Sequence, residues 1–166
     1  MINNIIRELF SFPNPVNEVA ARLVAGMVML LCIGTVISGH PLLFVVLAYG
    51  FLARVATGPT LSPLGLIATR VIVPLLGNPT RLVPGPPKRF AQAIGLAFSG
   101  LALVLVLILE STVLAKTLVG VLVVFTFLES VLGFCAGCFV FNYLMRWGLI
   151  PESVCEQCVI STGDDD

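Results

Sequence analysis

The sequence predicts an all-α membrane protein: a bundle of four transmembrane helices with an interfacial or re-entrant segment between the second and the third. Two compositional values support this fold class. Hydrophobic residues make up 58% of the 166 residues and charged residues only 11%, whereas soluble domains carry about 25% charged residues. A single soluble domain of this length leaves much of its surface in water, so it cannot hide so much apolar area. The length favours one domain.

The third observation is the length of the apolar runs, because a spanning helix needs about 20 mostly apolar residues. The apolar stretch 23–53 contains no Lys, Arg, Asp or Glu and is interrupted only at Gly39-His40-Pro41. Proline is favoured in the first turn of a helix, so we expect a hairpin of two helices there. The four predicted spans cover residues 17–38, 41–57, 91–110 and 118–141.

Two loops rich in glycine and proline, residues 57–63 and 77–88, enclose a shorter apolar segment. This segment, residues 64–76, would extend only about 20 Å as a helix, which is less than the thickness of the hydrocarbon core. We therefore predict an interfacial or re-entrant segment, with Arg70 directed toward water or a protein partner.

The positions of the basic residues predict the orientation, because Lys and Arg are concentrated in cytoplasmic loops. In the predicted topology only Lys116 lies on the outer side. The other eight lie on the opposite side: Arg7, Arg22, Arg54, Arg70, Arg81, Lys88, Arg89 and Arg146. Both termini and the tail 147–166 are therefore expected in the cytoplasm. The net charge is zero, which argues against a nucleic-acid partner.

Four of the five cysteines form two C-x-x-C pairs, Cys135 with Cys138 and Cys155 with Cys158. Such a pair supports redox or sulfur-relay chemistry, because one thiol acts as the nucleophile and the other resolves the mixed disulfide. The spacing of the two pairs is equally typical of a four-cysteine zinc site or a rubredoxin-like iron site. A third interpretation is that all four are inert. Cys32, inside the first predicted helix, is expected to be a small buried apolar residue.

These interpretations lead to different functions. The first is a membrane thiol–disulfide or sulfur-relay protein that uses both cysteine pairs at the cytoplasmic face. The alternative is a non-catalytic accessory subunit of a larger membrane complex, with a metal-binding or inert cysteine cluster. A carrier or channel for a small sulfur species is a third possibility, so the sequence leaves open whether the protein is an enzyme.

A carboxylate also falls inside the fourth predicted span, where charged side chains are costly and need a partner or a function. Glu129 lies about 16 Å from the outer end of that span, and Arg54 lies at a similar depth in the second. Because Arg22 already has Glu18 one helical turn away, we predict a structural ion pair between Arg54 and Glu129. His40 is expected to be a turn residue.

Four segments carry a resemblance to a known group of proteins. They are residues 12–18 (FPNPVNE), 58–65 (GPTLSPLG), 86–92 (PPKRFAQ) and 133–138 (GFCAGC). With these segments the chain resembles an uncharacterised family of small bacterial integral-membrane proteins, a domain of unknown function with about four helices. The resemblance implies a bacterial inner-membrane location and a thioredoxin-like or rhodanese-like partner. It implies no activity.

Overall fold

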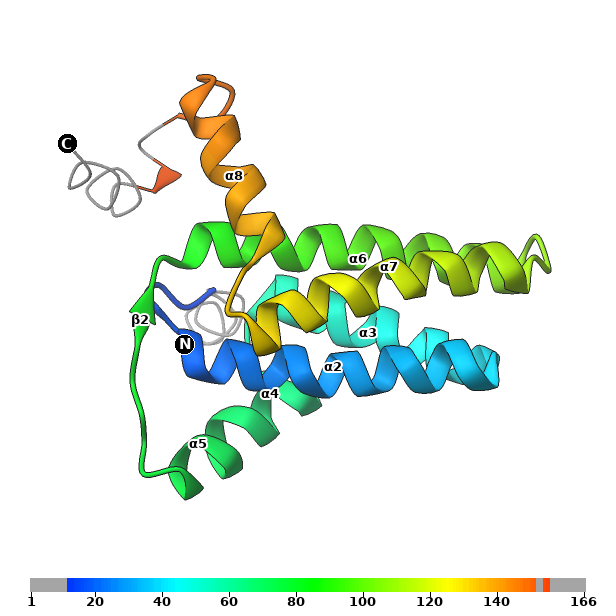
Figure 1. The fold of residues 1–166 in the computed structure, drawn as a ribbon, viewed down its shortest axis with the longest axis horizontal. Coiled ribbons are helices and arrows are strands. Elements are labelled where there is room, and N and C mark those ends of the chain that lie inside the picture. Colours follow the sequence, from blue (N-terminus) through cyan, green and yellow to red (C-terminus); the bar gives the residue numbers. More distant parts are fainter. Residues whose placement is uncertain (1–11, 152–153, 156–166) are drawn as a thin grey trace, which may run out of the picture.

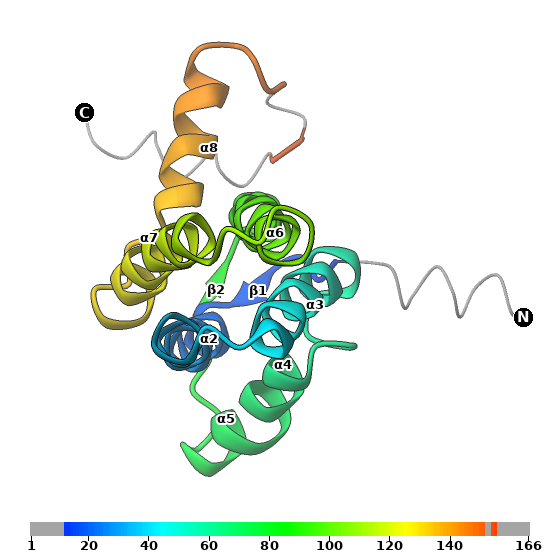
Figure 2. The ribbon, with the colours of Figure 1, turned by 90° about the vertical axis from the view of Figure 1, so that its right-hand side faces the viewer.

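The structure is a computed structural model that describes residues 12–151 and 154–155. The predicted all-α fold is confirmed. Four long helices run side by side (Figures 1 and 2), and α2 packs against α7, α3 against α6, and α6 against α7. Their bounds are α2 (Glu18–Ser38), α3 (Pro41–Thr57), α6 (Gly85–Leu107) and α7 (Thr112–Val131).

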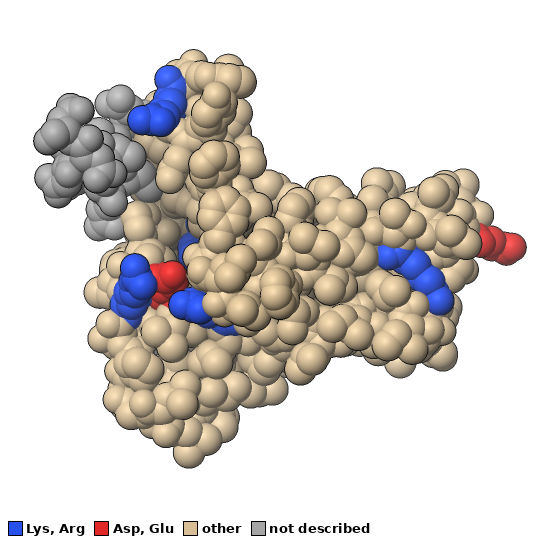
Figure 3. Space-filling view, in the orientation of Figure 1, with Lys and Arg blue, Asp and Glu red and all other residues tan. Residues whose placement is uncertain are grey.

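Within the described part of the chain, α2, α6 and α7 are long and apolar enough to cross a membrane. The helix α3 has 17 residues, which is the lower limit for a span. Uncharged residues cover most of the long flank of the bundle in Figure 3, whereas most of the visible charged side chains gather at the end that carries β1 and β2. This distribution is that of a membrane-type protein.

The hairpin of α2 and α3 agrees within one residue with the segments predicted at 17–38 and 41–57. At the start of α2, the Asn17 side chain accepts a hydrogen bond of 3.0 Å from the Val19 N–H. The helix ends where Gly39 adopts a left-handed conformation with φ of 67°. His40 then caps α3, because its Nδ1 accepts the Leu42 N–H at 3.3 Å.

The predicted segment 64–76 is a short helical excursion on one side of the bundle (Figure 2). It consists of α4 (Pro63–Ile67), the π-helical turn η1 (Ala68–Ile72) and α5 (Val73–Leu75). Ser62 begins it by accepting a hydrogen bond from the Gly65 N–H at 3.3 Å. Arg70 lies in η1 and is exposed.

A two-stranded antiparallel sheet at one end of the bundle was not predicted. The strand β1 (Val16–Asn17) pairs with β2 (Leu82–Val83), with Val16 opposite Val83 and Asn17 opposite Leu82. Strands of two residues have no alternating pattern that a sequence would reveal. The sheet joins the segment before α2 to the segment before α6, at the end of the bundle where both helices begin (Figure 1).

The predicted helix over residues 118–141 is wrong. The helix α7 ends at Val131, and a separate helix α8 (Ala136–Arg146) points away from the bundle (Figure 1). Gly133, with φ of 69°, turns the chain between them, and the Phe134 N–H closes the turn on the Leu128 carbonyl oxygen at 3.0 Å. Apolar residues continue on both sides of this break, so hydropathy predicts one continuous span over residues 118–141.

Candidate functional site

Cys135 and Cys138 lie at the start of α8, and Cys135 is its N-cap residue. The Cys135 sulfur accepts a hydrogen bond of 3.4 Å from the backbone N–H of Cys138. Both side chains are half-buried, and both are free thiols. The structure therefore brings this predicted pair together in the arrangement expected of a nucleophile at a helix N-terminus, where thiolates are stabilised.

The two thiols differ in acidity. The pKa of the Cys135 thiol is lowered, chiefly because the Cys138 side chain donates a hydrogen bond to it, and the Lys88 ammonium and the Cys138 N–H act in the same direction. Burial and the Glu129 carboxylate oppose this shift. The pKa of Cys138 is raised, because that thiol is the donor in the pair and is also desolvated. Cys135 is therefore the thiol that ionises first.

The predicted ion pair between Arg54 and Glu129 is wrong. Glu129 instead bonds Lys88, whose Nζ lies 2.8 Å from its Oε1, and both side chains are largely buried. Depth along a helix axis does not determine which residues of neighbouring helices face one another. Lys88, expected in the loop 77–88, lies in the first turn of α6 and so reaches Glu129.

Arg54 is buried in α3, with only 5% of its surface exposed. Its Nε donates a hydrogen bond to Gln92 Oε1 at 2.8 Å, and its Nη1 donates to Ser62 Oγ at 3.4 Å. Its guanidinium also lies 4.5 Å from the centroid of the Phe51 ring. Neither ion pair found in the described residues includes Arg54, so its hydrogen-bond acceptors are neutral and the Glu129 carboxylate, which lines the same cavity, acts on it only through space.

Two contacts fix the position of the thiol pair. A Cβ placed at Gly137 would lie 2.5 Å from the Ala91 Cβ, so the missing side chain lets α8 lie against α6. Arg22 donates hydrogen bonds to the carbonyl oxygens of Ser130 at 3.1 Å and Val131 at 2.9 Å, at the end of α7. This places a cation where a helix terminus favours one. Arg22 therefore does not pair with its helical neighbour Glu18, which bonds Arg81 at 2.9 Å.

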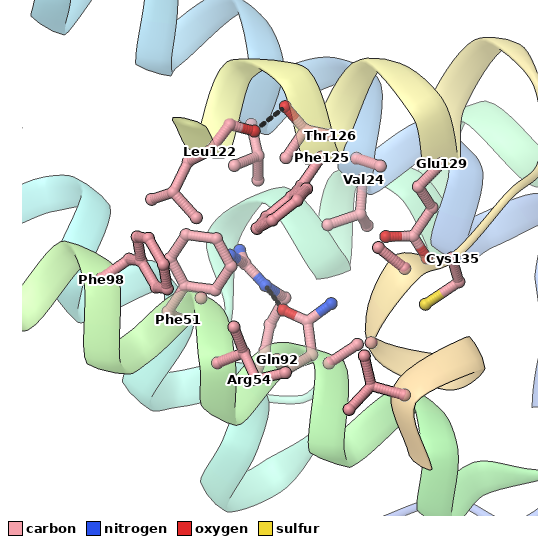
Figure 4. Close-up of a pocket in the computed structure, with 18 residues that line it drawn as sticks. Val24, Phe51, Arg54, Gln92, Phe98, Leu122, Phe125, Thr126, Glu129 and Cys135 are labelled. Carbon is pink, nitrogen blue, oxygen red and sulfur yellow. Dashed lines mark hydrogen bonds between the residues drawn. The ribbon is translucent and has the colours of Figure 1, made fainter. Parts of the chain in front are cut away.

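Two hollows meet at Cys135. One, of about 280 Å³, is lined by Cys135, Cys138, Lys88 and Glu18, among others. The other, of about 190 Å³, lies between the long helices and the start of α8. Figure 4 shows this second cavity, with Arg54 and Gln92 at its middle, Cys135 and Glu129 toward one side, and Phe51 and Phe98 toward the other.

The second cysteine pair is only partly within the described residues. Cys155 is buried and bonded in a disulfide, and Cys158 lies outside the described range. Val154 lines a separate hollow with Phe90 and Phe141. Among the residues that the structure describes, no group of three or more His, Cys, Asp or Glu side chains is arranged to hold a metal ion. The zinc or iron site of four cysteines stays a prediction.

Three residues with polar contacts in or beside the site were not predicted to have this role: Lys88, Gln92 and Arg22. Lys88 and Gln92 are one helical turn apart in α6, and this helix was predicted to begin later than it does. The proline pair before Lys88 was interpreted as part of a loop, although proline is tolerated in the first turn of a helix. Cys32 is fully buried in the core, as expected.

Residues 16–146, most of the chain, match the family described as "Domain of unknown function (DUF4395)". No curated protein and no solved structure matches the chain.

Proposed function

Since the chain belongs to the DUF4395 family, whose description assigns no activity, we propose its function from the site itself: a membrane protein that exchanges thiols and disulfides through Cys135 and Cys138. One observation carries the proposal. Cys135 caps α8 and accepts the Cys138 N–H at 3.4 Å, so a sulfur with a lowered pKa precedes, by one helical turn, a sulfur with a raised one.

The two thiols then have separate roles. The Cys135 thiolate attacks one sulfur of a partner disulfide, which forms a mixed disulfide and releases the other partner sulfur as a thiolate that takes up a proton. Cys138 loses its proton and attacks the Cys135 sulfur. The Cys135–Cys138 disulfide forms, and the second partner sulfur leaves and is protonated. Two electrons pass from the cysteine pair to the partner, which ends as a dithiol.

The Lys88–Glu129 ion pair controls the electrostatic environment of the Cys135 thiolate. The Lys88 ammonium favours the Cys135 thiolate, and Glu129 both holds the ammonium and disfavours a second negative charge nearby. Lys88 also lines the hollow that contains both sulfurs. A partner disulfide that enters this hollow would meet the more acidic thiol beside a fixed positive charge, which is where a leaving thiolate is stabilised.

The end of the bundle that carries the thiols favours a cytoplasmic partner. Arg22, Arg81 and Lys88 make their polar contacts at this end, whereas Lys116 approaches Gly39 in the loop between α2 and α3. Because cytoplasmic segments are enriched in basic residues, we place Cys135, Cys138 and both termini on the cytoplasmic side. A thioredoxin-like or rhodanese-like protein is the class of partner that fits there.

Trapping tests the proposal. Cys138→Ser removes the resolving thiol, so a partner should remain bound to Cys135 through a disulfide that a reductant cleaves. Cys135→Ser, the matched variant one helical turn away, should trap none, and Cys32→Ser should behave like the parent protein. Mass spectrometry of the trapped cysteine separates a protein disulfide from a persulfide, the product that a sulfur relay would leave. Equal trapping by Cys135→Ser and Cys138→Ser would refute the assignment of roles.

A further inference from the structure

The cavity between the long helices has a composition that the thiol pair alone does not explain. Its walls are mostly apolar, and three of them are the aromatic rings of Phe51, Phe98 and Phe125. At its middle lie the Arg54 guanidinium and the Gln92 amide, and Cys135 lies toward one side (Figure 4). A flat apolar group with polar atoms at its edge fits such walls, since aromatic rings stack well on one another.

Arg54 indicates what the polar atoms should be. A buried guanidinium is costly unless an acceptor offsets its charge. Here its hydrogen-bond acceptors are neutral, and the nearby Glu129 carboxylate, which acts on it through space, is bonded to Lys88 instead. A ligand that accepts hydrogen bonds, and that gains negative charge as it reacts, would be stabilised beside it.

The cavity lies among helices whose outer surfaces carry many exposed apolar side chains. Phe98 of α6 and Phe125 of α7 are half-buried and meet edge to face with ring centroids 6.2 Å apart, and Val140 of α8 is 43% exposed. Both α6 and α7 are long and apolar enough to span a membrane. The surroundings of the cavity therefore favour a lipid-soluble ligand over a hydrated anion.

We propose that this cavity binds the head group of a membrane quinone, which acts as the electron acceptor for the Cys135–Cys138 dithiol. The proposal rests on the function proposed above and names its oxidant. An isoprenoid quinone is flat and lipid-soluble, has carbonyl oxygens that accept hydrogen bonds, and takes up two electrons. These properties match the aromatic walls, the apolar outer surfaces of the surrounding helices, Arg54 and the thiol pair.

The step balances within the site. The S–H bonds of Cys135 and Cys138 break, and one S–S bond forms between the two sulfurs. The two electrons pass to the quinone ring, and the two protons released by the thiols become the hydroxyl protons of the quinol. Arg54 stabilises the negative charge that the quinone oxygen carries before it is protonated. The Cys135–Cys138 disulfide is then reduced again by a dithiol partner at the hollow beside Lys88, through the reverse of the exchange described above, so that with a quinone as acceptor the partner ends as a disulfide.

Anaerobic quinone reduction by the full-length protein in lipid nanodiscs tests this. The protein is reduced, freed of reductant and mixed with decylubiquinone, whose ring is fully substituted. We expect one quinol for each pair of thiols lost, and none with Cys135→Ser or Cys138→Ser. Phe125→Ala removes a ring that lines the cavity and should slow the reaction roughly tenfold. Phe127→Ala, on the same helix but outside the cavity, should leave the rate unchanged.

A second readout separates the two proposals. The same reduced samples are mixed with a water-soluble disulfide, which Phe125→Ala should reduce at the parent rate. If the soluble disulfide is reduced but the quinone is not, or if the alanine substitutions at Phe125 and Phe127 slow quinone reduction equally, the quinone site is refuted and the thiol function survives. If neither acceptor is reduced, both proposals fail. Phe98→Ala replaces Phe125→Ala in this comparison if the latter does not fold.

Discussion

Lys88 Nζ lies 2.8 Å from Glu129 Oε1, so a buried ion pair joins the first turn of α6 to the last turns of α7. We expect Lys88→Met and Glu129→Gln each to lower the free energy of unfolding by about 3–5 kcal/mol, because each leaves one buried charge unpaired. The double variant should lower the free energy of unfolding by clearly less than the sum of the losses in the two single variants. Denaturation in mixed detergent micelles measures this. Additive losses would contradict the pair.

The exposed pair at the other side of the site is the control. Arg81 bonds Glu18 at 2.9 Å, but 74% of the Arg81 side chain is exposed. Arg81→Gln should therefore lower the free energy of unfolding by no more than about 1 kcal/mol.

The pH dependence of alkylation should separate the two thiols. Only the thiolate reacts, so Cys135, with its lowered pKa, should reach half of its maximal rate below the pH of about 8.5 that is usual for a free thiol. Cys138, with its raised pKa, should react only at higher pH. Iodoacetamide labelling followed by mass spectrometry reads each cysteine separately.

Two substitutions should move the Cys135 profile in opposite directions. Lys88 lowers the pKa of Cys135 and Glu129 raises it, so Lys88→Met should shift the profile to higher pH and Glu129→Gln to lower pH. A shift of both profiles in the same direction would show that loss of packing, and not charge, controls the thiol.

The contact of Gly137 with Ala91 should be intolerant of any side chain. Gly137→Ala places a Cβ 2.6 Å from the Ala91 Cα, and such overpacking typically costs about 1–3 kcal/mol. Gly120→Ala is the control, because a Cβ there has no neighbour within 4 Å and alanine favours a helix over glycine. Of these two variants, we expect only Gly137→Ala to lower the stability of the protein and to change the alkylation rate of Cys135.

Arg22 should matter to the thiols although it does not touch them. Arg22→Met removes the hydrogen bonds to the Ser130 and Val131 carbonyl oxygens, each worth about 1.5–3 kcal/mol because the donor is charged. The end of α7 should then fray. Hydrogen exchange of the Leu132 and Phe134 amides, which bond the Leu128 carbonyl oxygen, should become faster. Arg146→Met, at an exposed position in α8, should leave both amides unchanged.

The orientation can be tested with single added cysteines in a variant that lacks the native ones. Asn78→Cys lies in the connection between α5 and β2, and Thr112→Cys lies at the start of α7, toward the opposite end of the bundle. A membrane-impermeant maleimide added to intact cells should label Thr112→Cys and spare Asn78→Cys. Labelling of Asn78→Cys alone would reverse the topology.

Local signals in the sequence were sufficient for the first half of the fold. The apolar stretch 23–53 is interrupted only by Gly39, His40 and Pro41, and this interruption is sufficient to predict the α2–α3 hairpin. The boundary between α7 and α8 has no such contrast, because apolar residues continue on both sides of Gly133. Hydropathy reports depth in a membrane, and it is insensitive to a change of direction by a chain that remains among apolar groups.

The site shows the same distinction. The C-x-x-C spacing alone identified Cys135 and Cys138, since their proximity is local. The partner of Glu129 could not be identified in this way, because it depends on which helix faces α7 and on how each helix is rotated about its axis. The helix α3 packs on α6, so Arg54 meets Gln92. The helix α6 also packs on α7, so Lys88 meets Glu129.

The pairing of β1 with β2 also has a consequence for biosynthesis. Val16 emerges from the ribosome long before Val83, its partner in the sheet, and the α2–α3 hairpin and the α4–α5 excursion are synthesised in between. The first helical hairpin is therefore synthesised while its N-terminal strand is still unpaired. The two strands can pair only after residues 82 and 83 have been synthesised, so the sheet is closed after the hairpin and the α4–α5 segment have left the ribosome.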